Sequence, residues 1–120
     1  MLVTAALLAC GASRAATVPR PVNALPSAPP RILYVHFSAT VVRVGSWWSG
    51  RVVTTTNVAS LEFRAPSFSF VLHRAAYGEF AFDTHVLVVP SIYRRAFVAT
   101  LVARTASGAS EREEFHLAFE

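Results

Sequence analysis

Apolar and polar residues alternate in short runs along the chain from residue 31 onward. Phe68, Phe70 and Leu72 are spaced two apart, and Phe80 and Phe82 repeat the spacing. Because successive side chains of a β-strand point to opposite faces, this period predicts strands that bury one face. Runs of alternating or β-forming residues occupy positions 32–37, 47–56, 61–63, 68–72, 78–86, 97–104 and 114–119. No stretch of ten or more residues has a helical period, although one helical turn is expected over Ser91–Ala96.

Turn-forming residues separate these runs at regular intervals. They lie at Asn57, Ala65–Ser67, Ala76–Gly78, Pro90–Ser91 and Ala106–Gly108. Short strands spaced roughly 8–12 residues apart are typical of an antiparallel sandwich. We therefore expect residues 31–120 to form one all-β sandwich of about seven strands. The chain has one cysteine, so the domain is built without an intramolecular disulfide.

Three segments resemble the immunoglobulin-like fold in its bacterial, disulfide-free form. Gly50–Val58 resembles the second strand and the turn after it. Gly78–Phe80, followed by Val89–Pro90, resembles the fifth strand and its corner, and Ala99–Gly108 resembles the sixth strand. The resemblance implies an immunoglobulin-like sandwich but no particular ligand, because this fold carries many functions.

The sixth strand carries the most detailed part of this resemblance. Many family members read Tyr-x-Cys-x-Ala-x-Asn-x-x-Gly there, and Ala103 and Gly108 match that pattern. Ala99, Leu101 and Thr105 replace the family's Tyr, Cys and Asn. The usual core Trp of the third strand is also missing, so the resemblance implies that Leu61 or Phe63 fills its place.

The N-terminus is typical of an export signal. Met1–Ala9 is apolar but shorter than the roughly 20 residues that span a bilayer, so it fits the apolar part of a secretory signal. Leu7-Leu8-Ala9-Cys10-Gly11 resembles the lipobox of bacterial lipoproteins, with Leu three before the Cys and a small residue just before it. The resemblance implies cleavage before Cys10 and acylation of its thiol, which anchors the protein to a membrane.

Two other interpretations of this segment stay open, because no Lys or Arg follows Met1 as signals normally require. One is an ordinary secretory signal cut near Ala12–Ala16, which gives a secreted or periplasmic protein. The other is a chain that is not exported. We expect an exported protein of the cell envelope, with residues 1–9 as signal peptide and residues 10–30 as lipidated Cys and linker.

The linker is rich in proline and small residues. Five of the seven prolines lie within Gly11–Pro30, and Ala, Ser and Gly fill much of the rest. Such a composition supports neither a helix nor a packed core, so it predicts an extended, semi-stiff tether.

Charge changes this picture little. Lys plus Arg number eleven, all of them Arg, against seven acidic residues, and the net charge is +4. The arginines are dispersed, and only Arg94 and Arg95 are adjacent. Nucleic-acid binding needs basic residues concentrated on one face, so we expect no nucleic-acid partner.

Trp47 and Trp48 are the leading candidate for a binding surface. Adjacent strand residues point to opposite faces, and the parity of Val52 places Trp48 inward and Trp47 outward. An exposed Trp suits stacking on a sugar ring or burial in a protein partner. The alternative is that the linker or a loop covers Trp47.

A second candidate lies after Pro90, where Tyr93, Arg94 and Arg95 fall in an expected loop. Binding groups concentrate in loops, and paired arginines suit a carboxylate or a phosphate. The alternative is an ordinary solvated loop.

Catalytic and metal chemistry have weaker support. Asp83 and His85 share one face of an expected strand, as half of a nucleophilic triad would, but no Gly-x-Ser-x-Gly motif accompanies them. His36, His73, His85 and His116 lie on separate expected strands. The first and last strands of such a sandwich can be neighbours, which would bring together His36 and His116, two metal ligands at best. We expect no cofactor and no metal site.

These observations predict a non-enzymatic immunoglobulin-like module of the cell envelope that mediates protein interaction, adhesion or envelope assembly. Its expected partners are an envelope or surface protein, a glycan, and the membrane through a lipid on Cys10. A carbohydrate-binding module using Trp47 is the alternative, and a small hydrolase using Asp83 and His85 is a more remote one.

Overall fold

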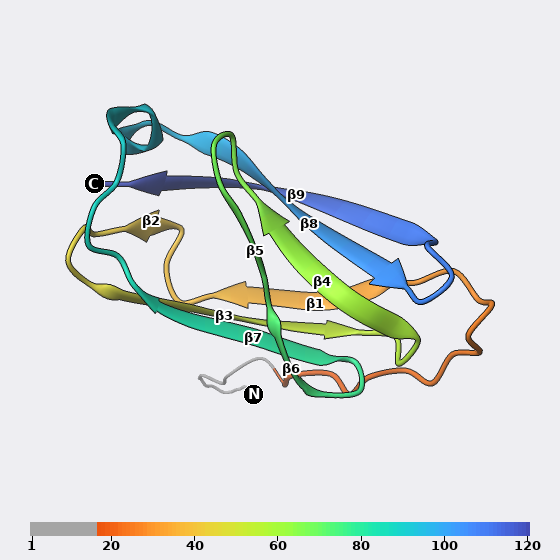
Figure 1. Ribbon diagram of the computed structural model, residues 1–120. Coiled ribbons are helices and arrows are strands. Elements are labelled where there is room, and N and C mark those ends of the chain that lie inside the picture. Colours follow the sequence, from red (N-terminus) through yellow and green to blue (C-terminus); the bar gives the residue numbers. More distant parts are fainter. Residues whose placement is uncertain (1–16) are drawn as a thin grey trace.

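The computed structural model describes residues 17–120, which form two sheets packed face to face (Figure 1). The expected signal peptide and Cys10 lie outside the described residues, so the lipobox stays a prediction. Within residues 17–120 the elements are nine strands and one short 3₁₀-helix, η1 (Ser91–Arg94).

The first sheet has four strands and the second has five. The first has the order β1-β3-β7-β6, with β1 at Ile32–Phe37, β3 at Trp47–Thr54, β7 at Glu79–His85 and β6 at His73–Ala76. The second has the order β2-β9-β8-β4-β5, with β2 at Val41–Val42, β9 at Ser110–Phe119, β8 at Phe97–Thr105, β4 at Val58–Arg64 and β5 at Ser69–Val71. Pairing is antiparallel except between β2 and β9, which run parallel. This is the immunoglobulin-like arrangement, and the fold class predicted from the sequence is confirmed.

The chain changes sheets at Leu72. The run 68–72 is predicted as one strand, but the structure splits this region into β5, a crossing residue and β6. Leu72 is buried, and its N–H donates to the Leu61 carbonyl at 2.8 Å. The short strands β2 and β6 lack an alternating pattern, which is why the sequence does not predict them.

The core is rich in aromatic residues. Trp48 packs edge-on against Phe63 with 5.7 Å between ring centroids, and Phe37 stacks on Trp48 at the same distance. The buried indole satisfies its Nε1–H by donating to the Ala39 carbonyl at 3.1 Å. Leu61 and Phe63, the two residues that the resemblance offers in place of the usual Trp, are both fully buried.

Residues 17–30 are docked against the domain, whereas their composition predicts an extended, semi-stiff tether without a packed core. The Thr56 N–H donates to the Val22 carbonyl, and the Asn57 Nδ2 amide donates to the carbonyls of Leu25 and Ala28 at 3.2 and 2.7 Å. The prolines exclude a helix, yet the carbonyls of this segment remain free to accept hydrogen bonds from the β3–β4 turn.

Figure 1 shows this segment along the outer side of the four-stranded sheet. Pro21 lies against Gly78, and Val22 forms a parallel bridge with Thr55. Val53 points to the same side as Arg51, yet it is buried, as expected for a residue beneath this segment. The folded unit therefore begins before residue 31, the boundary predicted from the sequence.

Candidate binding pocket at one end of the sandwich

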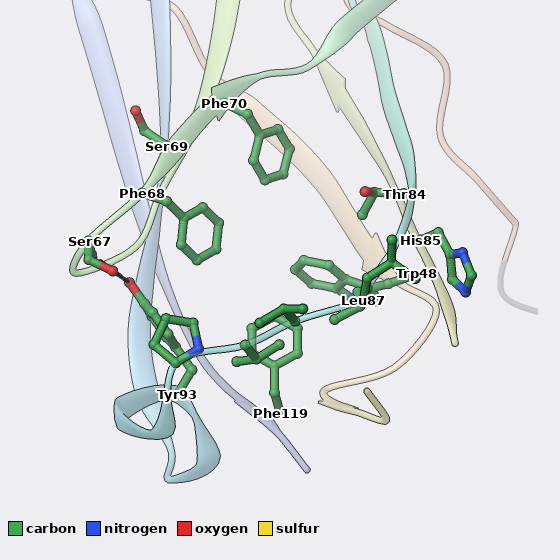
Figure 2. A pocket seen from close by; sticks show the side chains of 14 residues that line it. Trp48, Ser67, Phe68, Ser69, Phe70, Thr84, His85, Leu87, Tyr93 and Phe119 are labelled. Carbon is green, nitrogen blue, oxygen red and sulfur yellow. Dashed lines mark hydrogen bonds between the residues drawn. The ribbon is translucent and has the colours of Figure 1, made fainter. Parts of the chain in front are cut away.

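A pocket of about 530 Å³ opens between the sheets at the end that holds η1. The turn between β4 and β5 forms one side, and the segment Val86–Pro90 forms the other (Figure 2). Five aromatic residues line it: Trp48, Phe68, Phe70, Tyr93 and Phe119. The remaining lining is aliphatic, with Ser67, Ser69, Thr84 and His85 as the polar residues. The pocket therefore suits an uncharged, largely apolar group.

The sequence around Pro66 shapes the turn side of the pocket. The Ala65 N–H donates to the Phe68 carbonyl at 2.8 Å, which closes a tight turn between β4 and β5. Phe68 and Phe70 then stack on the buried Phe63, at 6.0 and 4.9 Å between centroids. Phe68 is 38% exposed, so the pocket mouth presents an aromatic ring to solvent.

Tyr93 requires a correction, because it is fully buried rather than on the binding surface. The 3₁₀ turn after Pro90 directs the ring between the sheets, where it packs edge-on against Phe97 at 4.7 Å. Its hydroxyl accepts the Ser67 N–H and lies 2.6 Å from the Ser67 Oγ. Tyr93 therefore fixes the β4–β5 turn and lines the pocket from inside. No local spacing in the sequence indicates this burial, because Phe97 already belongs to β8 and Ser67 lies in a distant turn.

Arg94 and Arg95 are exposed beside the pocket, as predicted. Among residues 17–120 neither takes part in an ion pair, since both ion pairs found there involve Glu62. The structure places two cationic groups at this end of the molecule, and anion binding by them stays a prediction.

The two tryptophans point as their parity predicts. Trp48 is buried, whereas Trp47 is 67% exposed, so neither the docked segment nor a loop covers it. The Trp47 ring stacks on His85, with 4.9 Å between centroids and 12° between planes. This contact follows from the register, because Trp47 pairs with His85 across β3 and β7. Trp47 is therefore held as a flat aromatic surface beside the pocket.

Asp83 and His85 share the outer face of β7, but they do not form a catalytic pair. Both are exposed, and the His85 Nε2 lies 2.9 Å from the Gly45 carbonyl. Within the described chain no hydrogen bond joins His85 to Asp83 or to a serine hydroxyl. The geometry gives the hydrolase hypothesis no support.

The histidines are dispersed over both sheets. His36 lies on β1 and His73 on β6 of the first sheet, whereas His116 lies on β9 of the second. Within residues 17–120 no three His, Cys, Asp or Glu residues converge as metal ligands would.

Glu62 is the centre of an ion-pair network on the outer face of the five-stranded sheet. Its Oε1 accepts from the Arg64 Nε at 3.0 Å and the Arg104 Nη1 at 3.2 Å. Burial by itself would raise the pKa of the Glu62 carboxyl, but the hydrogen bonds and charges of Arg104 and Arg64 outweigh it and lower this pKa. Glu62 pairs with Val102 on β8, and Val102 is fully buried on this outer face. The network thus shields an apolar side chain.

No family model matches the chain, and no curated protein matches it significantly. Among residues 17–120 no helix is long and apolar enough to cross a membrane.

Proposed function

We propose that this protein is a non-enzymatic, lipid-anchored immunoglobulin-like module of the cell envelope, which acts by binding an exported or surface protein in adhesion or envelope assembly. The pocket is the observation that carries the binding function. Its aromatic lining suits a bulky apolar side chain presented by a partner, because such anchors in desolvated pockets dominate binding energies. The lipobox resemblance at Cys10 supports the anchor.

The binding part of the proposal is tested by cross-linking at the pocket mouth in intact cells. A photo-reactive phenylalanine analogue at Phe68 is expected to yield a cross-linked product of higher mass. The matched control is the same analogue at Val98, which is 44% exposed on the outer face of β8. It is expected to yield no cross-linked product. Thr84 lines the pocket, so Thr84→Phe should fill it and abolish the product. Equal cross-linking from Phe68 and Val98 would refute the pocket as the binding site.

The anchor is tested separately by fatty-acid labelling. Wild type is expected to carry label and to fractionate with membranes, whereas Cys10→Ala is expected to be unlabelled and released. An unlabelled, soluble wild type would contradict the lipoprotein assignment and leave a secreted binding module.

A second candidate function is carbohydrate binding at Trp47. The supporting observation is that the exposed Trp47 ring stacks on His85. The next cross-strand pair on the same outer face, Ser49 and Asp83, supplies polar groups beside it. Stacking on a sugar ring needs such a platform with hydrogen-bonding groups beside it. Trp47→Ala should then lose retention on a polysaccharide array without losing stability, and equal retention would end this candidate.

A further inference from the structure

Three segments join at the end of the sandwich that holds the pocket (Figure 1). The β2–β3 loop pairs with Val86, since the Gly45 N–H donates to the Val86 carbonyl and the Val86 N–H donates to the Ser46 carbonyl at 2.9 Å. Residues 86–90 lead directly into η1, where the Tyr93 N–H donates to the Pro90 carbonyl at 3.0 Å. We call residues 43–47 and 86–95 the tip.

Large apolar side chains at the tip are exposed to solvent. Trp47, Leu87 and Val88 are 67%, 66% and 88% exposed. Leu87 and Val88 are consecutive, and Trp47 adjoins the same segment through its stacking on His85. Adjacent apolar groups with this much exposure mark a surface that another apolar phase or partner covers.

Cationic side chains accompany these apolar residues. Arg43 lies in the β2–β3 loop, and Arg94 and Arg95 lie at the end of η1, all three exposed. Both ion pairs found in residues 17–120 involve other arginines. Residues 43–47 and 86–95 contain no Asp or Glu, although Glu120 adjoins the β2–β3 loop, where its carbonyl accepts the Val44 N–H at 2.7 Å. The tip therefore combines an apolar centre with a surplus of positive charge.

We propose that the tip docks on the surface of an anionic lipid bilayer. Trp47, Leu87 and Val88 enter the interface, and the three arginines contact lipid phosphates. Because Leu87 and Val88 also line the pocket, a single molecule either docks its tip on the membrane or holds a partner in the pocket. Indole rings favour the headgroup level, exposed aliphatic residues gain by leaving water, and arginines are attracted to anionic leaflets.

Two other occupants fit the tip less well. A second copy in a two-fold contact would bring the arginines of one tip against those of the other. A glycan stacked on Trp47 would use Ser49 and Asp83 on the sheet face and would leave Leu87 and Val88 uncovered. Charge complementarity therefore favours an anionic membrane.

The N-terminal segment limits how far the domain can lie from the bilayer. Cys10 lies seven residues before Thr17, where the described chain begins. Seven residues span at most about 25 Å when fully extended, so an acylated Cys10 would hold the domain close to the bilayer. This supporting argument rests on the proposed lipid anchor, whereas docking of the tip does not require it.

Vesicle binding of the full chain carrying Cys10→Ser tests the proposal without any contribution from lipidation. The chain is expected to sediment with phosphatidylcholine vesicles that contain phosphatidylglycerol, and to remain in solution with phosphatidylcholine alone. Lipids with brominated acyl chains are expected to quench the exposed Trp47. Residues 1–16 contain no Trp, so quenching reports the domain and not the N-terminal segment. Trp47→Phe should abolish most of this quenching, because the remaining Trp48 is buried.

Matched variants separate the tip from general surface effects. Arg94→Ser with Arg95→Ser should weaken binding about 25-fold, at roughly fivefold for each arginine at a membrane surface. The charge-matched control is Arg51→Ser with Arg112→Ser, which removes the same two charges from the sheet faces. This control should bind the vesicles much more tightly than the variant that lacks Arg94 and Arg95. Leu87→Ser with Val88→Ser should reduce binding at least about tenfold. The apolar control is Leu25→Ser with Val71→Ser, two residues of similar exposure away from the tip.

Several results would overturn the proposal. Sedimentation without quenching of Trp47 would mean that residues 1–16 bind the vesicles. Equal binding to neutral vesicles would mean that the arginines do not contribute to binding. Equal losses in the tip and control variants would also refute it. A lipid-free dimer that the tip variants dissociate would identify a second copy as the occupant. Because the test uses Cys10→Ser, failure of fatty-acid labelling on Cys10 would not affect its outcome.

Discussion

Gly78 offers the sharpest test of the docked segment 17–30. Its φ is +76°, and a Cβ built there would lie 2.6 Å from the Pro21 Cβ and 2.7 Å from the Thr54 carbonyl oxygen. Gly45 and Gly108 have φ values of +94° and +95°, and a Cβ at either would meet nothing within 4 Å. The three glycines therefore share the conformational penalty, but Gly78 alone adds a collision.

These geometries give different magnitudes for Gly→Ala. A left-handed backbone costs an alanine about 1–2 kcal/mol, so Gly45→Ala and Gly108→Ala should destabilise by about that amount. Forcing a methyl group into a filled site adds about 1–3 kcal/mol, so Gly78→Ala should cost about 2–5 kcal/mol. The measurement is urea unfolding followed by the fluorescence of the buried Trp48.

A second background separates the two contacts of the added methyl group. Pro21→Gly removes the ring that the methyl group would strike, so Gly78→Ala should cost less in that background than in wild type. The collision with the Thr54 carbonyl should persist there. If all three alanine variants lost equal stability, Gly78 would not be covered and the docking of residues 17–30 would be wrong.

Three further predictions address the core, the pocket and the ion pairs. Leu101→Ala should cost about 2–5 kcal/mol, and an unchanged denaturant midpoint would mean that β8 does not cross the core. Tyr93→Phe removes the hydroxyl bonded to Ser67 and should cost about 1–3 kcal/mol, with faster hydrogen exchange at the Ser67 amide as its specific mark. Because the pKa of Glu62 is lowered, its carboxylate stabilises the fold above its ordinary value of 4.5 and loses this contribution as the pH falls below it. Urea titration at several pH values should show that wild type is more stable than Glu62→Gln at pH 7 and that this difference narrows in acid. A difference that widened in acid would contradict a lowered pKa of Glu62.

Local periodicity was sufficient to predict the sandwich. Each predicted run contains residues of an observed strand, and the opposite directions of Trp47 and Trp48 follow from strand parity alone. Periodicity could not predict β6, since all four of its residues are exposed and leave no alternation to detect.

The pocket and the docked segment could not be predicted because they depend on contacts between distant residues. Tyr93 is buried through Ser67, 26 positions earlier, and Asn57 holds Leu25, 32 positions earlier. Proline content describes what residues 17–30 cannot form on their own. It does not reveal the Asn57 amide that receives them.

The edges of the two sheets have a consequence for self-association. β2 has two residues, β5 has three, β6 has four, and a register shift interrupts β1 between Ile32 and Tyr34. At the start of β1 the Ile32 N–H is already occupied by the Glu111 carboxylate at 2.8 Å. Long, straight, unpaired edges are the templates on which sheets of different molecules add to one another. Within residues 17–120, however, β2 pairs only with Ala118 and Phe119 of β9, so residues 110–117 of β9 form an edge without a second strand partner. We therefore expect any edge-to-edge pairing between crowded copies to begin at β9.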